Sequence, residues 1–136
     1  MKRKDLIELA KEATKNSYVP YSNFTVGALL VTKEGKAYLG CNIENHGIMS
    51  ICAERVAFTK ALSEGEREFK EIYVVGKKQE QNKFIETLPC GYCRQFMSEF
   101  CSTDFKIFTY DEEKDLIKEY TLEELLPNSF GNKNEL

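Results

Sequence analysis

The order of elements that the sequence predicts indicates an α/β sandwich with a mixed sheet. Segments with apolar residues at helical spacing alternate with short apolar runs that are typical of buried strands. In chain order, we expect a helix, two strands, a helix, a strand, a helix, two strands and a helix. Strands and helices that alternate in this way form a sheet covered by helices.

The first half of the chain is expected to supply two helices and a hairpin. Apolar residues at helical spacing predict an amphipathic helix over residues 4–16. Residues 24–32 are typical of a buried strand, and residues 36–43 are expected to be its hairpin partner. A helix-favouring run over 52–63 predicts a second helix, which Gly65 ends.

The second half is expected to complete the sheet. The short apolar run in 71–76 is typical of a central strand, and 89–100 favours a helix with a proline in its first turn. Two further strands are expected at 105–110 and 116–120. A capping box over 121–124 then predicts a short last helix.

Composition and charge narrow the classes of function. The chain has 136 residues, of which 42% are hydrophobic and 30% charged, as is typical of one soluble globular domain. The net charge of −3 gives no electrostatic reason to expect a nucleic-acid partner. The longest apolar run, 26–31, is far too short to span a membrane, and no export signal is visible. We therefore expect a cytoplasmic protein without a membrane partner.

The five cysteines are an odd number, which makes a disulfide framework a poor interpretation. Metal ligation, catalysis and core packing are the alternatives for each. Cys41 and Cys101 have no neighbouring metal-binding motif. We expect both to be small buried apolar residues.

Cys90 and Cys93 stand two residues apart at the start of a predicted helix, with both sulfurs on the same side. The positive end of a helix favours thiolate, which is the metal-binding form. Cys52 starts another predicted helix and can supply a third sulfur. Three protein ligands leave the fourth position of zinc open, as in a catalytic site. A Cys-x-x-Cys pair alone would also fit a structural zinc knuckle or a redox pair.

Glu54 adds a proton carrier to this group of cysteines. It lies two residues after Cys52, close enough to reach the open metal position without being a ligand. A carboxylate at that place can take a proton from an attacking water and deliver it to a substrate. Cys-x-Glu followed by Pro-Cys-x-x-Cys is the signature of zinc deaminases.

Two arginines follow the ligand motifs. Three thiolates and Zn²⁺ sum to a charge of −1, which weakens zinc as a Lewis acid. Guanidinium donors from Arg55 and Arg94 would withdraw part of this charge from the sulfurs. The alternative interpretation is that both are surface arginines in ion pairs.

Together these motifs resemble the cytidine deaminase family, specifically its small homotetrameric type. The similarity covers nearly the whole chain and rests on Tyr21-Ser22-x-Phe24-x-Val26-Gly27-Ala28, Gly40-x-Asn42-Ile43-Glu44-Asn45, Cys52-Ala53-Glu54-Arg55, Pro89-Cys90-Gly91-x-Cys93-Arg94-Gln95, Glu99-Phe100 and Glu124-Leu125-Leu126-Pro127-x-x-Phe130. The resemblance implies a three-layer α/β/α sandwich with a mixed sheet of about five strands. It also implies that residues 1–136 form a single catalytic domain, with one Zn²⁺ per chain, in a homotetramer.

The resemblance also assigns substrate contacts. Phe24 would pack against the base and sugar, while Asn42 and Glu44 would hydrogen-bond the ribose 3′-hydroxyl. The backbone of Ala53 and the carboxyl of Glu54 would hydrogen-bond the edge of the cytosine base. Phe130 would reach into the active site of a neighbouring subunit. The plain alternatives are core packing for Phe24, strand-end shaping for the two polar residues, and an anchor within its own subunit for Phe130.

One segment departs from the family pattern. The family usually has small residues and then a tyrosine near the nucleoside 5′-hydroxyl, whereas this chain has His46-Gly47-Ile48. We interpret His46, the chain's one histidine, as a loop residue that makes at most a backbone contact with substrate. Altered handling of the 5′ end is the alternative.

The reaction that the resemblance implies is deamination of cytidine and deoxycytidine in pyrimidine salvage. A deaminase of a modified cytosine nucleoside such as blasticidin S is a neighbouring alternative, because that related family shares the zinc motifs. It tends to lack an arginine after Cys-Ala-Glu and keeps the Asn-x-Glu ribose element less well, so Arg55, Asn42 and Glu44 favour cytidine. A non-catalytic structural zinc module is a third interpretation, but neither Cys41 nor Cys101 has the spacing of a fourth ligand.

Overall fold

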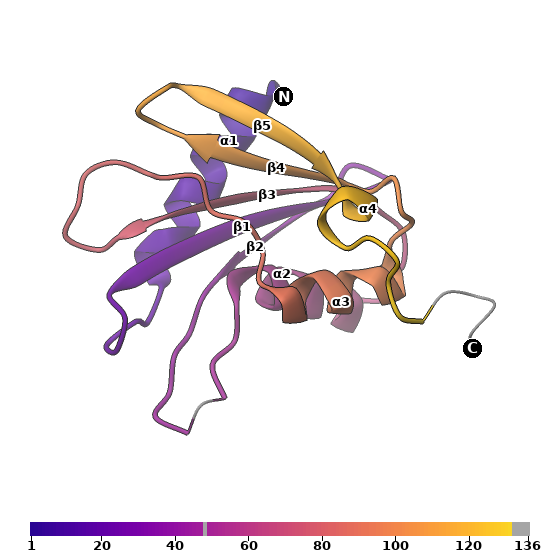
Figure 1. Ribbon diagram of the computed structural model, residues 1–136, viewed down its shortest axis with the longest axis horizontal. Coiled ribbons are helices and arrows are strands. Elements are labelled where there is room, and N and C mark those ends of the chain that lie inside the picture. Colours follow the sequence, from indigo (N-terminus) through magenta and orange to yellow (C-terminus); the bar gives the residue numbers. More distant parts are fainter. Residues whose placement is uncertain (48, 132–136) are drawn as a thin grey trace.

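A computed structural model describes residues 1–47 and 49–131. Within them, five strands form one sheet in the order β2-β1-β3-β4-β5 (Figure 1). The strands are β1 (Phe24–Thr32), β2 (Ala37–Cys41), β3 (Phe69–Lys78), β4 (Lys106–Asp111) and β5 (Leu116–Thr121). The β3–β4 pair is parallel and the other neighbouring pairs are antiparallel, so the sheet is mixed, as predicted.

Helices cover both faces of this sheet (Figure 1). α1 (Arg3–Ala13) packs on one face against β1 and β3, and the turn η1 (Thr14–Asn16) follows it. α2 (Ala53–Ser63) and α3 (Gly91–Phe100) lie side by side on the other face, with the short α4 (Leu122–Leu125) next to α3. The predicted three-layer α/β/α sandwich is thereby confirmed.

The central strands supply two separate cores. In β1, Leu29 faces α1, whereas Ala28 and Leu30 face α2 and α3. In β3, Tyr73 and Val74 are divided between the two faces in the same way. A strand that is buried on both faces shows a continuous apolar run rather than strict alternation, which is the pattern that the sequence displays.

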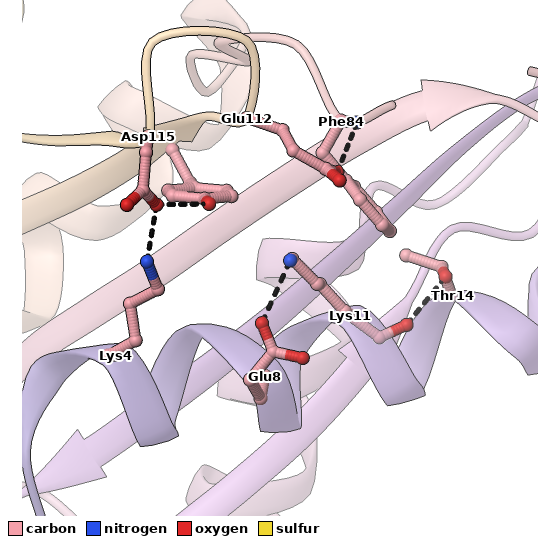
Figure 2. Close-up of polar contacts among 8 residues, drawn as sticks. Lys4, Glu8, Lys11, Thr14, Phe84, Glu112 and Asp115 are labelled. Carbon is pink, nitrogen blue, oxygen red and sulfur yellow. Dashed lines mark hydrogen bonds and ion pairs between the residues drawn. The ribbon is translucent and has the colours of Figure 1, made fainter. Parts of the chain in front are cut away.

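Figure 2 shows polar contacts along α1, one of which reaches the turn between β4 and β5. Lys4 pairs with Asp115 in the turn between β4 and β5, and the Lys11 ammonium lies 2.8 Å from Glu8 Oε2. The same ammonium lies 4.7 Å from the ring centre of Tyr110. Exposed ion pairs contribute about 0–1 kcal/mol each, so apolar burial is the main force holding α1 on the sheet.

Two glycines let the helices approach the sheet from opposite sides. A Cβ on Gly40 of β2 would lie 2.3 Å from the carbonyl oxygen of Ala53, at the start of α2. A Cβ on Gly27 of β1 would lie 2.1 Å from the carbonyl oxygen of Ala10 in α1. Both distances are far inside van der Waals contact, so any side chain at either position would push a helix away.

The element boundaries differ from the sequence prediction at places that matter for function. The helices expected from residues 52 and 89 begin at Ala53 and Gly91, so Cys52 and Cys90 are the residues that cap them. The strand expected to reach residue 43 ends at Cys41. Beyond Cys41, the Asn42 side chain bonds to the backbone of β1, and Ile43 forms isolated bridges with Tyr18 and Ile51 instead of continuing the hairpin.

The described helices include none that is long and apolar enough to cross a membrane.

We predict that Gly40→Ala and Gly27→Ala each lower the free energy of unfolding by about 1–3 kcal/mol, because overpacking displaces a helix. Gly91→Ala is the control, since its added Cβ would meet no atom within 4 Å. Urea denaturation measures all three. Equal stability of the three variants would contradict the packing role of the two sheet glycines.

Candidate active site

Three cysteine sulfurs converge where α2 and α3 begin. Cys52 caps α2, Cys90 caps α3, and Cys93 lies in the first turn of α3. Their Sγ atoms all lie within 4.8 Å of one another, and the Cys52 and Cys90 sulfurs are 3.6 Å apart. Residues about 40 positions apart in sequence are therefore brought together by two helix N-termini.

This arrangement fits a zinc ion. Tetrahedral zinc with Zn–S bonds of about 2.3 Å requires sulfur–sulfur distances of roughly 3.8 Å, and the cluster is already near that geometry. Among residues 1–47 and 49–131, the group contains three candidate ligands and no fourth histidine, cysteine or carboxylate. Three protein ligands with an open fourth position are the pattern of a catalytic site.

The helix ends and the sulfurs themselves favour thiolate. The backbone N–H of Cys93 points at the Cys90 sulfur over 3.5 Å, which uses one of the unpaired donors of the helix start. A hydrogen bond from the Cys93 thiol lowers the pKa of Cys52 to about 5. The same bond, with burial, raises the pKa of Cys93. The cluster therefore holds one thiolate on Cys52 readily at neutral pH.

A small pocket opens beside the cluster. Its volume is about 230 Å³, and it is lined by Phe24, Val26, Asn42, Cys52, Ala53, Glu54, Thr87, Leu88 and Cys90. Mainly apolar walls with a few convergent polar groups are typical of small-molecule sites. A larger hollow of about 670 Å³ lies at the end of α3, near Leu122 and Phe130, and its lining includes none of the three clustered cysteines.

Glu54 is the buried carboxyl of this pocket. It lies in the first turn of α2 and is 3% exposed. Burial, together with the negative charge of the Cys52 thiolate, raises the pKa of Glu54 to about 7. A carboxyl in this environment can be found in either protonation state near neutrality.

A third glycine, Gly76, lets two residues of the pocket wall, Phe24 and Thr87, pack closely against β3. A Cβ on Gly76, near the end of β3, would lie 2.9 Å from the Phe24 ring and 2.5 Å from Thr87 Oγ1. Thr87 and Leu88 were not among the residues predicted from sequence. Their position immediately before Pro89-Cys90 is the signal that could have identified them.

The comparisons with known proteins agree with this geometry. The family described as the cytidine and deoxycytidylate deaminase zinc-binding region matches residues 1–109. The chain belongs to this family. Its cofactor is zinc, which the family binds and which the three-cysteine cluster is able to hold.

Two relatives and one solved structure match along nearly their whole length. The cytidine deaminase of Sporosarcina psychrophila is 42% identical over 130 residues, which cover 95% of this chain and 91% of the relative. That of Halalkalibacterium halodurans is 44% identical over 132 residues, covering 96% and 95%. The crystal structure of cytidine deaminase from Burkholderia pseudomallei matches with a TM-score of 0.85 at 41% identity, covering 96% of this chain and 100% of that chain.

The two polar residues predicted to bind ribose hydrogen-bond to β1 and to the segment before it. Asn42 accepts from the Val26 N–H and donates to the Phe24 carbonyl, both over 2.9 Å. Glu44 accepts from the backbone N–H of Tyr21 and from the Ser22 hydroxyl, which lowers the pKa of Glu44. Asn42 lines the pocket, whereas Glu44 is not part of its lining.

The two arginines of the family motifs have different surroundings. Arg55 Nη2 lies 3.9 Å from Cys52 Sγ and 3.2 Å from the Ser50 carbonyl oxygen. Arg94 instead donates to the carbonyl oxygens of Pro89 and Leu125, each over 2.8 Å. Arg55 is thus placed for contact with the sulfurs, while Arg94 ties the start of α3 to the end of α4. The charge-tuning roles of Arg55 and Arg94 both stay predictions.

Four other predicted positions lie away from the pocket of their own chain. Phe130 is 70% exposed, and its carbonyl accepts from Gln95 Nε2. His46 is exposed in the turn between β2 and α2, next to Gly47, and Ile48 of the same segment lies outside the described residues. Cys41 and Cys101, expected to be buried, are half-buried and lie outside the metal cluster.

We predict one zinc per chain in the purified protein, and we predict that Cys90→Ala loses it. Removing one of three sulfurs leaves a site with too few ligands to hold zinc firmly. Cys41→Ala is the control, because it removes a half-buried cysteine outside the cluster. Elemental analysis decides. Full zinc content in Cys90→Ala, or none in the unmodified chain, would show that the ligand assignment is wrong.

Proposed function

We propose that this chain hydrolyses the 4-amino group of cytidine and deoxycytidine, giving uridine or deoxyuridine and ammonia. The observation that carries the proposal is the buried Glu54 carboxyl in the same pocket as Cys52 and Cys90. A metal site with an open position needs an adjacent proton carrier for hydrolysis, and Glu54 is placed to be one. The cytidine deaminase relatives support the choice of substrate.

In the proposed reaction, the metal would activate a water molecule and the Glu54 carboxyl transfers protons. Cys52, Cys90 and Cys93 would hold the zinc ion, which would supply an activated water at neutral pH. Glu54 takes a proton from this water as its oxygen bonds to C4 of cytosine, and delivers the proton to N3. Glu54 then takes the second proton from the new hydroxyl group on C4 and carries it to the 4-amino nitrogen. The C4–N4 bond breaks, ammonia leaves, and C4 keeps the oxygen as the uracil carbonyl.

The pocket walls suit a free nucleoside. Phe24 offers an aromatic face to base and sugar, and the Ala53 backbone, beside Glu54, reads the cytosine edge. Asn42 uses one N–H of its amide within the chain and keeps a second for the ribose 3′-hydroxyl, with Glu44 as a further acceptor. A contact to the 3′-hydroxyl does not inspect the 2′ position, so both sugars are accepted.

The alternative functions are weaker on specific grounds. A structural zinc module requires a fourth protein ligand, and the described residues contribute three to the cluster. Such a module would also leave Glu54 buried without a role. A blasticidin-type deaminase is disfavoured by Arg55 beside the sulfurs and by Asn42 at the pocket.

We infer that the chain works as a homotetramer. The loop between β2 and α2 stands away from the body of the molecule (Figure 1). Exposed apolar side chains lie on this loop and just before α3, namely Ile43, Met49, Ile51 and Leu88. A second copy of the chain would cover them. In that assembly the exposed Phe130 completes a neighbour's pocket.

The remaining assignments follow from the same chemistry. Residues 1–136 act as one catalytic domain in pyrimidine salvage. Reduced thiols in the zinc cluster, together with unpaired Cys41 and Cys101, suit the cytoplasm, where disulfides are rare. A pocket of about 230 Å³ suits a small free nucleoside rather than a nucleic-acid strand.

We predict that the unmodified chain releases ammonia from cytidine and deoxycytidine, and that Glu54→Gln lowers kcat by at least about 10²–10⁴-fold while zinc is retained. The amide keeps the shape of the side chain but cannot carry the proton. Ammonia release and elemental analysis measure the two quantities.

Glu71→Gln is the matched control, because Glu71 is also a buried carboxyl but accepts from Tyr73 on the α1 face of the sheet. It should leave kcat within about twofold. Near-normal turnover in Glu54→Gln would refute the mechanism. Turnover of blasticidin S but of neither nucleoside would refute the proposed substrate.

We predict that Phe130→Ala raises KM for cytidine by about 10- to 100-fold, as expected for loss of one large apolar contact. Its zinc content should not change. Leu116→Ala, on β5, removes another exposed apolar side chain and serves as the control. Light scattering should give the mass of a tetramer. A fully active monomer would contradict the shared pocket.

A further inference from the structure

Arg55 is held by contacts from both ligand-bearing helices. It lies in the first turn of α2, and its guanidinium donates toward the Cys52 sulfur over 3.9 Å and to the Ser50 carbonyl over 3.2 Å. The ring centre of Tyr92, in the first turn of α3, lies 4.3 Å from the guanidinium carbon. The Arg55–Tyr92 contact therefore joins the two helices at the metal cluster.

Core packing does not account for Tyr92. Its side chain is 68% exposed, although it stands between Cys90 and Cys93 in the chain. It is not part of the pocket lining either, so a direct contact with the base is not its role. The interaction that the structure gives Tyr92 is the stack on Arg55.

The stack leaves Arg55 little freedom. Arg55 Nε is fully buried and has no hydrogen-bond partner among the described residues. A ring over one face of a guanidinium attracts the cation and keeps water from that face. With water excluded, the donors that remain are directed to the sulfur and to the carbonyl rather than to solvent.

We propose that Tyr92 is a positioning residue that acts through Arg55. Its ring holds the guanidinium against the Cys52 thiolate, so that Arg55 withdraws charge from the zinc ligands. This inference rests on the proposed function and deepens it. Three thiolates donate more charge than zinc needs, and a fixed hydrogen bond to one of them keeps zinc a strong Lewis acid.

Loss of the Tyr92 ring is expected to lower kcat rather than to weaken substrate binding. If the ring is removed, Arg55 gains solvent-exposed rotamers and the sulfur loses part of its hydrogen bond. The released charge on sulfur weakens activation at the metal. Since Tyr92 does not line the pocket, KM should stay nearly constant while kcat falls.

The test compares Tyr92→Ala and Tyr92→Phe with the unmodified holoenzyme and with its cobalt(II)-substituted form. Tyr92→Ala should lower kcat about 3- to 30-fold, the range that a cation–π contact supports, with KM within about twofold. The sulfur-to-cobalt charge-transfer band should move to longer wavelength, because a thiolate without its hydrogen bond gives up electrons more easily. Tyr92→Phe keeps the ring and should restore both kcat and the band.

Two controls separate positioning from other roles. In an Arg55→Lys background, which loses the planar fork, Tyr92→Ala should change kcat by less than about twofold. Leu116→Ala removes exposed apolar surface on β5 and should leave the band and kcat unchanged.

An unshifted band in Tyr92→Ala overturns the inference. So does an equal loss of kcat in Tyr92→Phe, an undiminished loss in the Arg55→Lys background, or a change of KM alone. A change of mass by light scattering with an unshifted band would show that the ring serves assembly instead, which also overturns it. Absence of ammonia release by the unmodified chain would refute the proposed function, and the cobalt band would still test Tyr92.

Discussion

The meeting of two helix N-termini on one face of the sheet is the constraint on which the site depends. α2 brings Cys52 and α3 brings Cys90 and Cys93, and their sulfurs lie within 4.8 Å of one another. This convergence requires α2 to lie directly on β2, and Gly40 provides the room for it. The positive ends of both helices then favour the anionic sulfurs that zinc requires.

The same convergence fixes the groups beside the metal ligands. Glu54 follows Cys52 in the first turn of α2, so helix geometry fixes the proposed proton carrier relative to Cys52. The pocket wall comes from β1 through Phe24, which Asn42 holds by hydrogen bonds to its strand. Arg55, one residue after the carboxyl, reaches back to the sulfur of Cys52. Short-range helical spacing thus sets the catalytic geometry, and longer-range packing sets the substrate cavity.

Features that depend on nearby residues could be predicted from the sequence, and features that depend on distant contacts could not. Periodicity identified the strands and long helices, and the local motifs identified the three cysteines, although capping by Cys52 and Cys90 moved two helix starts. The pocket position of Thr87 and the contact between Tyr92 and Arg55 could not be predicted, because each depends on a partner from another segment. The proposed contact of Phe130 with a neighbouring pocket would depend on a second copy of the chain, so the residues of one chain in isolation do not decide it.

The central claim is that three thiolates hold one zinc ion and leave its fourth position to a small oxygen ligand. Zinc X-ray absorption of the purified protein tests this most directly, because it counts sulfur neighbours and measures their distances. The account predicts three sulfurs at about 2.3 Å and one oxygen at about 2.0 Å. Four sulfurs around zinc would contradict it, since the site would then be closed and structural.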